Sequence, residues 1–240
     1  MPLFQKQNRD TSLISGVDIL TIFAIVPVKN LDASKTRLSS ILSPFERRDL
    51  TLAMLQDVLR TLRTAKIIDG IFVAGEDLKI QQTATIYGAS YFSTENLALN
   101  SCINEASKEC LSQRAGSVLV VPADIPLLKV RDIAKIIDLG LSSPSIVLSP
   151  SKDCGTNALY EHPPNLISAC FGTASFLNHV REAYRNKIRT KIYFSKGVAT
   201  DIDSVEDLKI VFRIENNTAC KRVLEKIVQN NEKAKAYFKN

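Results

Sequence analysis

Cysteine is scarce in this 240-residue chain, and its spacing excludes two common ways of stabilising a fold. The five cysteines are an odd number, and no two of them form a C-x-x-C pair. We therefore expect neither a disulfide framework nor a zinc knuckle, and a reducing compartment is favoured. A domain of this length buries roughly 70 to 75% of its unfolded surface without such cross-links.

Long apolar segments are also missing. The longest run, Ile19–Val28, is interrupted by Thr21 and Pro27 and is too short to span a bilayer. The first ten residues, MPLFQKQNRD, lack the apolar core of a signal peptide. The sequence therefore predicts a cytoplasmic protein without membrane contact, in which residues 1–18 form a flexible N-terminal extension.

The common phosphate-binding loops are absent too, because the chain has neither G-x-x-x-x-G-K-[ST] nor G-x-G-x-x-G. The net charge of +6 suits anionic small molecules, but no alternating basic and aromatic pattern favours nucleic acid. Histidine is limited to His162 and His179, neither of which lies in a convincing catalytic triad. We expect both on the surface or within helices.

Strand and helix patterns alternate along most of the chain, which predicts an α/β fold with a mostly parallel central sheet and helices on both faces. Strands are expected at Ile19–Pro27, Ile71–Gly75, Ala89–Phe92, Val118–Val121, Ile146–Pro150 and Lys191–Phe194. Without repeats or a Pro/Gly-rich linker, residues 19–214 form one expected domain. Residues 215–240 are expected to be a basic, peripheral helix.

The strand Val118–Val121 is the centre of this pattern, because its four apolar residues suit a strand buried on both faces. Pro122 ends the strand, and Asp124 follows just beyond its carboxyl end. Open α/β sheets bind their ligands at that end, so Asp124 is a candidate metal ligand. An Asp that starts a turn beside Pro126 is an equally good interpretation of this segment alone.

A basic loop follows the first strand. Lys29, Lys35 and Arg37 lie within nine residues, where they could surround a polyphosphate, with Arg37 binding two oxygens at once. A solvated basic loop is the alternative. The next segment begins a helix, because Ser43, Pro44 and Glu46 provide an N-cap, a proline at the first helical position and a capping box.

Two further loops carry glycine beside hydroxyl side chains. In the loop 151–157, Gly155 permits positive φ while Thr156 and Asn157 offer donors for a phosphate or a carboxylate. An ordinary tight turn is the alternative interpretation.

The second of these loops, Phe171–Ser175, places Gly172 just before a helix that ends near Arg185. Free backbone N–H groups at a helix start attract anions, and Ser175 would add a hydroxyl there. The alternative is that Thr173 simply caps the helix.

A pair of carboxylates follows in the segment 200–203. In an extended chain Asp201 and Asp203 share one face, while Ile202 turns into the core. Two like charges side by side repel unless a cation lies between them, and magnesium is the expected cation. Asp207 is left out of the site because Ser204 and Asp207 form a capping box for the helix Val205–Phe212.

These segments together resemble the 2-phospho-L-lactate guanylyltransferase family, whose members share the glycosyltransferase-A-like nucleotidyltransferase fold. The resemblance runs from about Ile25 to Leu208 and is specific because six motifs occur in order. The motifs are IVPVKNLDASKTRL (25–38), LSPFERRDLTLAMLQDVL (42–59), VVPADIPLL (120–128), GTNALY (155–160), FGTASFLNHV (171–180) and TDIDSVEDL (200–208).

The resemblance implies transfer of a guanylyl group from GTP to 2-phospho-L-lactate or phosphoenolpyruvate, with release of pyrophosphate, in the biosynthesis of a deazaflavin coenzyme. It also implies a homodimer. Carried over to this chain, the magnesium ligands are Asp124, Asp201 and Asp203. The acceptor ligands are Thr156, Gly172 and Ser175, with Asn157 beside them, and the triphosphate ligands are Lys29, Lys35 and Arg37.

Two departures from the family pattern concern Ala98, which replaces a glycine near the expected guanine site, and Cys154, which replaces a glycine in the loop 151–157. Two other classes of protein share parts of the pattern. A glycosyltransferase could use the same acidic pair with a nucleotide sugar, and a non-catalytic protein could only bind nucleotide. The basic loop favours a triphosphate substrate, and the clustered carboxylates favour catalysis.

Overall fold

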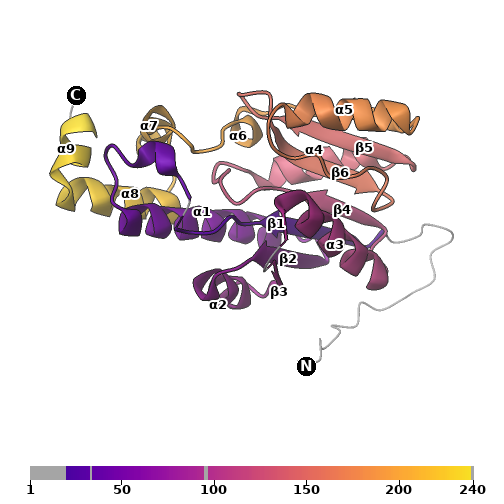
Figure 1. Ribbon diagram of the computed structural model, residues 1–240, viewed down its shortest axis with the longest axis horizontal. Helices are drawn as coiled ribbons and strands as arrows, with labels where there is room; N and C mark the ends of the chain where they lie inside the picture. The colour runs from indigo at the N-terminus through magenta and orange to yellow at the C-terminus, as the bar shows by residue number, and fades with distance from the viewer. Residues whose placement is uncertain (1–19, 33, 95–96, 239–240) are drawn as a thin grey trace.

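The computed structural model describes residues 20–32, 34–94 and 97–238, so the expected extension 1–18 lies outside the described residues (Figure 1). In this part of the chain the strands form one seven-stranded sheet with the order β3-β2-β1-β4-β6-β5-β7. The strands are β1 (Ile22–Pro27), β2 (Gly70–Gly75), β3 (Ser90–Ser93), β4 (Ser117–Val120), β5 (Ser145–Pro150), β6 (Thr156–His162) and β7 (Arg189–Ile192).

Helices surround the sheet, and the expected α/β class is confirmed. The helices are α1 (Pro44–Thr64), α2 (Leu78–Ile86), α3 (Leu99–Ser112), α4 (Val130–Gly140), α5 (Ser175–Arg185), α6 (Lys196–Ala199), α7 (Val205–Arg213), α8 (Ala219–Asn230) and α9 (Glu232–Phe238). A short 3-10 helix, Thr36–Leu38, lies in the basic loop. Among the described helices none is both long and apolar enough to cross a membrane.

Strand β6 differs from the sequence prediction, which treats the chain through Asn157 as a loop. The turn closes earlier, because Ser151 N–H donates to the Gly155 carbonyl and Ser151 Oγ accepts from Gly155 N–H, each at 2.9 Å. The chain then returns as β6, which pairs antiparallel with β4 and β5. The other described strand pairs are parallel, so β6 is the exception in a mostly parallel sheet.

Each face of the sheet is covered by its own helices. On one face, apolar residues of α1, α2 and α4 form a buried cluster with β1, β2 and β4. On the other face, residues of α3 and α5 pack against alternate residues of the same sheet. Ile25 and Val26 illustrate the alternation, because these neighbours in β1 are both fully buried but belong to opposite clusters.

Helix α1 begins where the sequence predicts. Ser43 Oγ accepts from Glu46 N–H at 3.3 Å, and Glu46 Oε2 accepts from Ser43 N–H at 2.7 Å, with Pro44 as the first helical residue. This capping box satisfies backbone donors that a helix start leaves without partners. Beyond this capped start, the helix buries apolar residues on one face from Leu50 to Leu62.

The C-terminal region forms two helices, α8 and α9, rather than the one peripheral helix expected for 215–240. Figure 1 shows both beside α1 and α7 at one end of the molecule. Cys220, Leu224 and Ala234 are buried there in a third apolar cluster with the first half of α1. In α8 the buried residues Cys220, Leu224 and Ile227, three to four residues apart, form the apolar stripe of an amphipathic helix.

Candidate active site

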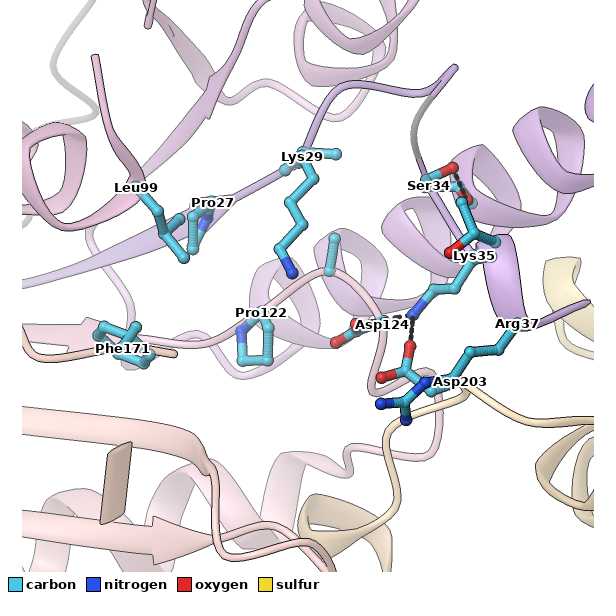
Figure 2. A pocket seen from close by; sticks show the side chains of 14 residues that line it. Pro27, Lys29, Ser34, Lys35, Arg37, Leu99, Pro122, Asp124, Phe171 and Asp203 are labelled. Atoms are coloured by element: carbon cyan, nitrogen blue, oxygen red, sulfur yellow. Dashed lines mark hydrogen bonds and ion pairs between the residues drawn. The ribbon is translucent and has the colours of Figure 1, made fainter. Parts of the chain in front are cut away.

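A cavity of about 300 Å³ lies at the carboxyl ends of β1 and β4 (Figure 2). Lys29 lies just beyond β1 and Asp124 just beyond β4, and both line the cavity. The chain runs outward from β1 through β2 to β3 and then crosses to β4 on the opposite side of β1. Open α/β sheets bind ligands at such a switch point. The topology therefore brings the basic loop and the central aspartate together.

Lys35 joins the two predicted groups of charged residues. Its Nζ lies 2.7 Å from Asp124 Oδ2 and 2.6 Å from Asp203 Oδ1, and its side chain is only 6% exposed. Burial disfavours the charged ammonium, but the two carboxylates outweigh burial and raise the pKa of Lys35. Lys35 also has a left-handed backbone, with φ of 52°. An L-residue adopts that conformation at a cost of about 1–2 kcal/mol, so surrounding contacts must hold it there.

Asp203 is surrounded by the predicted cations. Burial alone would raise its pKa, but Lys35, Lys29 and Arg37 together hold the pKa below its ordinary value. Figure 2 shows Arg37 beside Asp203 and the Lys29 side chain extending into the same cavity. The three cations predicted from the basic loop therefore act on one carboxylate. The Lys35 side chain is buried, whereas Lys29 and Arg37 are exposed.

Asp201 lies close to the other two aspartates. Burial raises its pKa, and the negative charges of Asp124 and Asp203 raise it further. Between Asp201 and Asp203, Ile202 is fully buried, which confirms the predicted alternation of the segment. The Ile202 N–H donates to the Asp124 carbonyl at 3.0 Å and holds the segment 200–203 against the loop after β4. The segment with Asp201 and Asp203 thus lies beside Asp124, although Asp124 is far from it in sequence.

The donors around Lys35 suit a magnesium ion only in part. Within the described residues, no group of three or more His, Cys, Asp or Glu side chains could hold a metal ion. Lys35 uses one oxygen each of Asp124 and Asp203, which leaves Asp124 Oδ1 and Asp203 Oδ2 for other ligands. Magnesium often takes one or two protein carboxylates and completes its shell with water and substrate phosphate. Asp124 and Asp203 fit a site of this kind, in which only two protein carboxylates contact the ion.

The predicted acceptor loops lie against each other. Phe176 N–H donates to the Cys154 carbonyl at 3.3 Å, and a Cβ on Gly155 would lie 3.8 Å from Ser175 Oγ. The first contact joins the start of α5 to the turn before β6, so Gly172, Ser175 and Thr156 belong to one region.

One expectation and one alternative interpretation for these loops are wrong. The residue with positive φ in the turn is Cys154, at 60°, and not Gly155. Cys154 adopts a backbone conformation that glycine would adopt more easily. Thr173 does not cap α5 either, because the N-cap residue is Ala174 with no side-chain capping bond.

Asn157 has a different role from the one expected. The register of β5 and β6 shifts so that Ser149 pairs with Ala158 and Pro150 with Thr156, which makes Asn157 the extra residue of a β-bulge. A bulge redirects side chains. The Asn157 amide donates to the Val198 carbonyl at 2.9 Å and to Asp201 Oδ1 at 3.3 Å. It therefore orients a carboxylate instead of facing the acceptor region.

Sequence reasoning missed the apolar side of the cavity. Figure 2 shows Pro27, Leu99, Pro122 and Phe171 opposite the charged residues. Asn100 fixes this wall, because its amide donates to the Phe171 carbonyl at 3.1 Å and accepts from Phe171 N–H at 2.8 Å. The available signal was the Leu99-Asn100 pair, which directly follows Ala98, the departure noted near the expected guanine site. Its partner, however, lies 71 residues away.

His179 was expected on the surface or in a helix, and only the second expectation is confirmed. It lies in α5 but is fully buried, with its ring packed edge-on against Phe171 at a centroid distance of 4.8 Å. Its Nδ1 lies 2.9 Å from Thr156 Oγ1. A single histidine in an amphipathic helix gives no sequence signal for such a contact.

A smaller cavity of about 180 Å³ adjoins the first and shares Lys29 and Leu99 with it. Its outer part is formed by Glu76, Thr94 and Leu97, which come from the ends of β2 and β3. The two cavities together extend from the charged residues along the carboxyl edge of the sheet.

Solved structures with this fold include nucleotide-processing enzymes. One, from Desulfovibrio desulfuricans G20 and named as a nucleotide-diphospho-sugar transferase, is 16% identical with a TM-score of 0.73, covering 90% of this chain and 97% of that chain. A 4-diphosphocytidyl-2C-methyl-D-erythritol synthase is 13% identical with a TM-score of 0.56, covering 80% and 96%. At these identities the likeness establishes the fold alone.

Relatives with higher sequence identity indicate the activity more specifically than the fold does. A phosphoenolpyruvate guanylyltransferase of Rubrobacter xylanophilus is 36% identical, covering 79% of this chain and 92% of that protein. A 2-phospho-L-lactate guanylyltransferase of Methanocaldococcus jannaschii is 32% identical, covering 85% and 88%. With the fold and the charged cavity, these relatives define the protein as a nucleotidyltransferase. The family model described as guanylyl transferase CofC like matches residues 22–237, and the chain belongs to that family.

Proposed function

We propose that the protein transfers the guanylyl group of GTP to the phosphate of a small phosphorylated acid, phosphoenolpyruvate or 2-phospho-L-lactate, and releases pyrophosphate. The observation that carries the proposal is the convergence of Lys29, Lys35 and Arg37 with Asp124 and Asp203 at the switch point of the sheet. Relatives that cover most of the chain and bear the names of these two activities support it.

The chemistry needs no general base from the protein. A phosphate monoester has a second pKa of about 6, so the acceptor is already an anionic nucleophile at neutral pH. One of its oxygens attacks the α-phosphorus of GTP while the bond from that phosphorus to the oxygen bridging to the β-phosphate breaks. That oxygen leaves with pyrophosphate. The main barrier is the repulsion between two polyanions, which fixed positive charge lowers.

The proposed GTP site spans both cavities. Lys29 and Arg37 bind the triphosphate in the larger cavity, where Arg37 can contact two phosphate oxygens at once. The purine lies in the smaller cavity, where the Glu76 carboxylate and Thr94 hydroxyl offer polar partners for a guanine edge. Leu99 lies at the junction and provides apolar contact to the base.

The proposed acceptor site consists of Thr156, Gly172 and Ser175. Their loops are joined by the contact of Phe176 N–H with the Cys154 carbonyl. This region adjoins the cavity, because Phe171 lines the cavity and directly precedes Gly172. Hydroxyl and backbone donors there suit the carboxylate and phosphate of a short acid.

Magnesium is proposed as the cofactor, held by Asp124 and Asp203 through the oxygens that Lys35 does not contact. Bound there with substrate phosphate, it would neutralise charge on the reacting phosphates. Asp201 lies behind this pair, fixed by Asn157, and completes the negative surroundings of the ion. Lys35 bridges the two carboxylates and orients them before substrate arrives.

For the intact protein we propose a cytoplasmic homodimer whose product enters biosynthesis of a deazaflavin coenzyme. Free cysteines support a reducing compartment: all five cysteines lie in the described part of the chain, and none forms a disulfide. Light scattering on the purified protein measures the assembly. A mass near twice 26.6 kDa supports the dimer, and a mass near 26.6 kDa contradicts it.

The assay that tests the activity measures pyrophosphate release with GTP, ATP, CTP or UTP, each with phosphoenolpyruvate, 2-phospho-L-lactate or no acceptor. We expect release with GTP and one of the acids and little without acceptor. Nucleotide sugars in place of the triphosphates test the glycosyltransferase alternative through release of nucleoside diphosphate. Absence of acceptor-dependent pyrophosphate with every triphosphate would overturn the proposal.

A further inference from the structure

The imidazole of His179 connects the two loops of the proposed acceptor site. Its Nε2 lies 2.9 Å from the backbone nitrogen of Cys170, and its Nδ1 lies 2.9 Å from Thr156 Oγ1. Phe171, which follows Cys170, packs edge-on against the same ring. Because His179 is fully buried, water does not compete for either nitrogen.

The backbone contact settles which nitrogen carries the proton. A backbone N–H can only donate, so Cys170 donates and Nε2 must be the unprotonated, accepting nitrogen. Burial lowers the pKa of His179 to about 4, which keeps the ring neutral at physiological pH. A neutral imidazole carries one N–H, and that N–H is therefore at Nδ1.

The state of His179 fixes the role of the Thr156 hydroxyl. Nδ1 carries the ring hydrogen, and both the Ser175 carbonyl and Thr156 Oγ1 lie where they can accept it. The hydroxyl hydrogen of Thr156 therefore cannot point at the ring. Thr156 lies on the α5 side of the sheet, because its hydroxyl contacts His179 of that helix, and Ser175 is the first residue of the same helix. The hydroxyl hydrogen is thus available to an acceptor other than the ring.

We propose that His179 is a positioning residue that presents the Thr156 hydroxyl as a fixed donor to an anionic oxygen of the acceptor acid. The inference rests on the proposed acceptor site. An unconstrained hydroxyl can donate or accept, and only the donating orientation binds an anion. A hydroxyl already oriented needs no rearrangement when the anion arrives, which is the advantage of a preorganised site.

Two substitutions of His179 separate its two contacts. H179N places an amide donor near the position of Nδ1 and can still donate to Thr156. H179Q places an amide oxygen near the position of Nε2, so it can still accept from Cys170 N–H while the donor to Thr156 is lost. The T156V variant removes the hydroxyl, and T156S keeps it.

The kinetic test measures KM for the acid and KM for GTP separately. We expect H179Q to raise KM for the acid about tenfold, the loss typical of one hydrogen bond to a charged group, with KM for GTP within about twofold. H179N and T156S should lie close to wild type. In the T156V background H179Q should add less than about twofold, because the hydroxyl it orients is gone. Equal effects of H179Q in both backgrounds, or equal effects on both substrates, would overturn the proposal.

A second readout does not depend on activity. Nitrogen-15 NMR of the histidine side chains, assigned with H179Q, reports which ring nitrogen carries the proton. We expect the Nδ1–H form of His179, unchanged between pH 6 and pH 8. An Nε2–H form or a charged ring would overturn the inference even if the enzyme assay succeeds. The expected tautomer without acceptor-dependent activity would instead show that the proposed function has failed.

Discussion

Lys35 has the least favourable position of any described cation in the cavity, and this identifies it as the centre of the site. Its backbone is left-handed and its ammonium is almost entirely buried. Each feature costs free energy, and the two carboxylates of Asp124 and Asp203 offset the burial. The sequence predicted that a cation would lie between carboxylates, but it could not show that a lysine of the chain would be that cation.

At the residue scale, the aspartates that hold Lys35 should be required for turnover. Replacing Asp124 or Asp203 by asparagine removes a negative charge and leaves the buried ammonium with one charged partner. We expect kcat to fall about 10²-fold or more, the usual loss for one electrostatic stabiliser. D138N, on the exposed face of α4, is the matched control and should keep full activity. Activity within a few fold of wild type in both D124N and D203N would contradict the assigned site.

Helix α8 is attached to α1 by one buried carboxylate. Asp57 accepts from Ala219 N–H and from Cys220 N–H, each at 2.8 Å, and these are the first two residues of α8. Burial raises the pKa of Asp57, although these two bonds oppose the shift. Asp57 lies more than 160 residues before Ala219 and Cys220. The basic sequence of residues 215–240 alone therefore predicted a peripheral helix.

D57A should therefore destabilise the fold. It leaves two buried backbone donors without an acceptor, and we expect a loss of about 2–4 kcal/mol in the free energy of unfolding. Urea unfolding measures the loss, with D49A on the exposed side of the same helix as control. If D57A and D49A unfolded at the same urea concentration, α8 would not depend on this contact.

A second buried carboxylate lies next to the last residue of strand β6. Glu161 is 4% exposed and accepts from Ile167 N–H at 3.0 Å, and burial raises its pKa to about 7 from 4.5. A raised pKa means that the folded protein favours the protonated carboxyl. The stability from this group is fully present below pH 4.5 and is lost as pH rises through about 7.

E161Q should weaken this dependence on pH. The shift corresponds to roughly 3 kcal/mol between the two ends of the range, and glutamine does not titrate. Urea unfolding at pH 5 and pH 8 gives the free energy of unfolding for both proteins. Wild type should lose more stability than E161Q over this range. An identical change in the two proteins would show that Glu161 titrates normally in the fold.

At the scale of the whole molecule, local patterns predicted most elements and the class of fold. Alternating strands and helices, the capping box at Ser43 and the buried Ile202 all agree with the structure. The misses share one cause. Strand β6, the packing of α8 and the burial of His179 each depend on partners distant in sequence, and local periodicity contains no information about them.

The candidate site also combines features that the local sequence predicts with contacts that depend on residues distant in sequence. The residues that should meet were identifiable. Lys29 and Asp124 follow the carboxyl ends of strands, and Thr156 and Ser175 follow glycine-containing loops. Asp201 and Asp203 share one face of an extended segment. Which of these residues contact one another could not be predicted from the sequence. Which oxygen contacts Lys35, and that Asn157 would bind Asp201 through a β-bulge, follow from register and strand order. The molecule as a whole then places the cations, Asp124 and Asp203 around one switch point, and Phe171 brings the loop before α5 to the same cavity.

Following the α-phosphorus of GTP tests the central claim most directly. GTP labelled at that atom is incubated with magnesium and either phosphoenolpyruvate or 2-phospho-L-lactate, and the products are separated by chromatography. The account predicts that the label appears in a compound joining guanosine to the acid through a diphosphate, about 10²-fold more slowly with D203N. Label that stays in GTP or appears only in GMP, with both acids, would contradict the account.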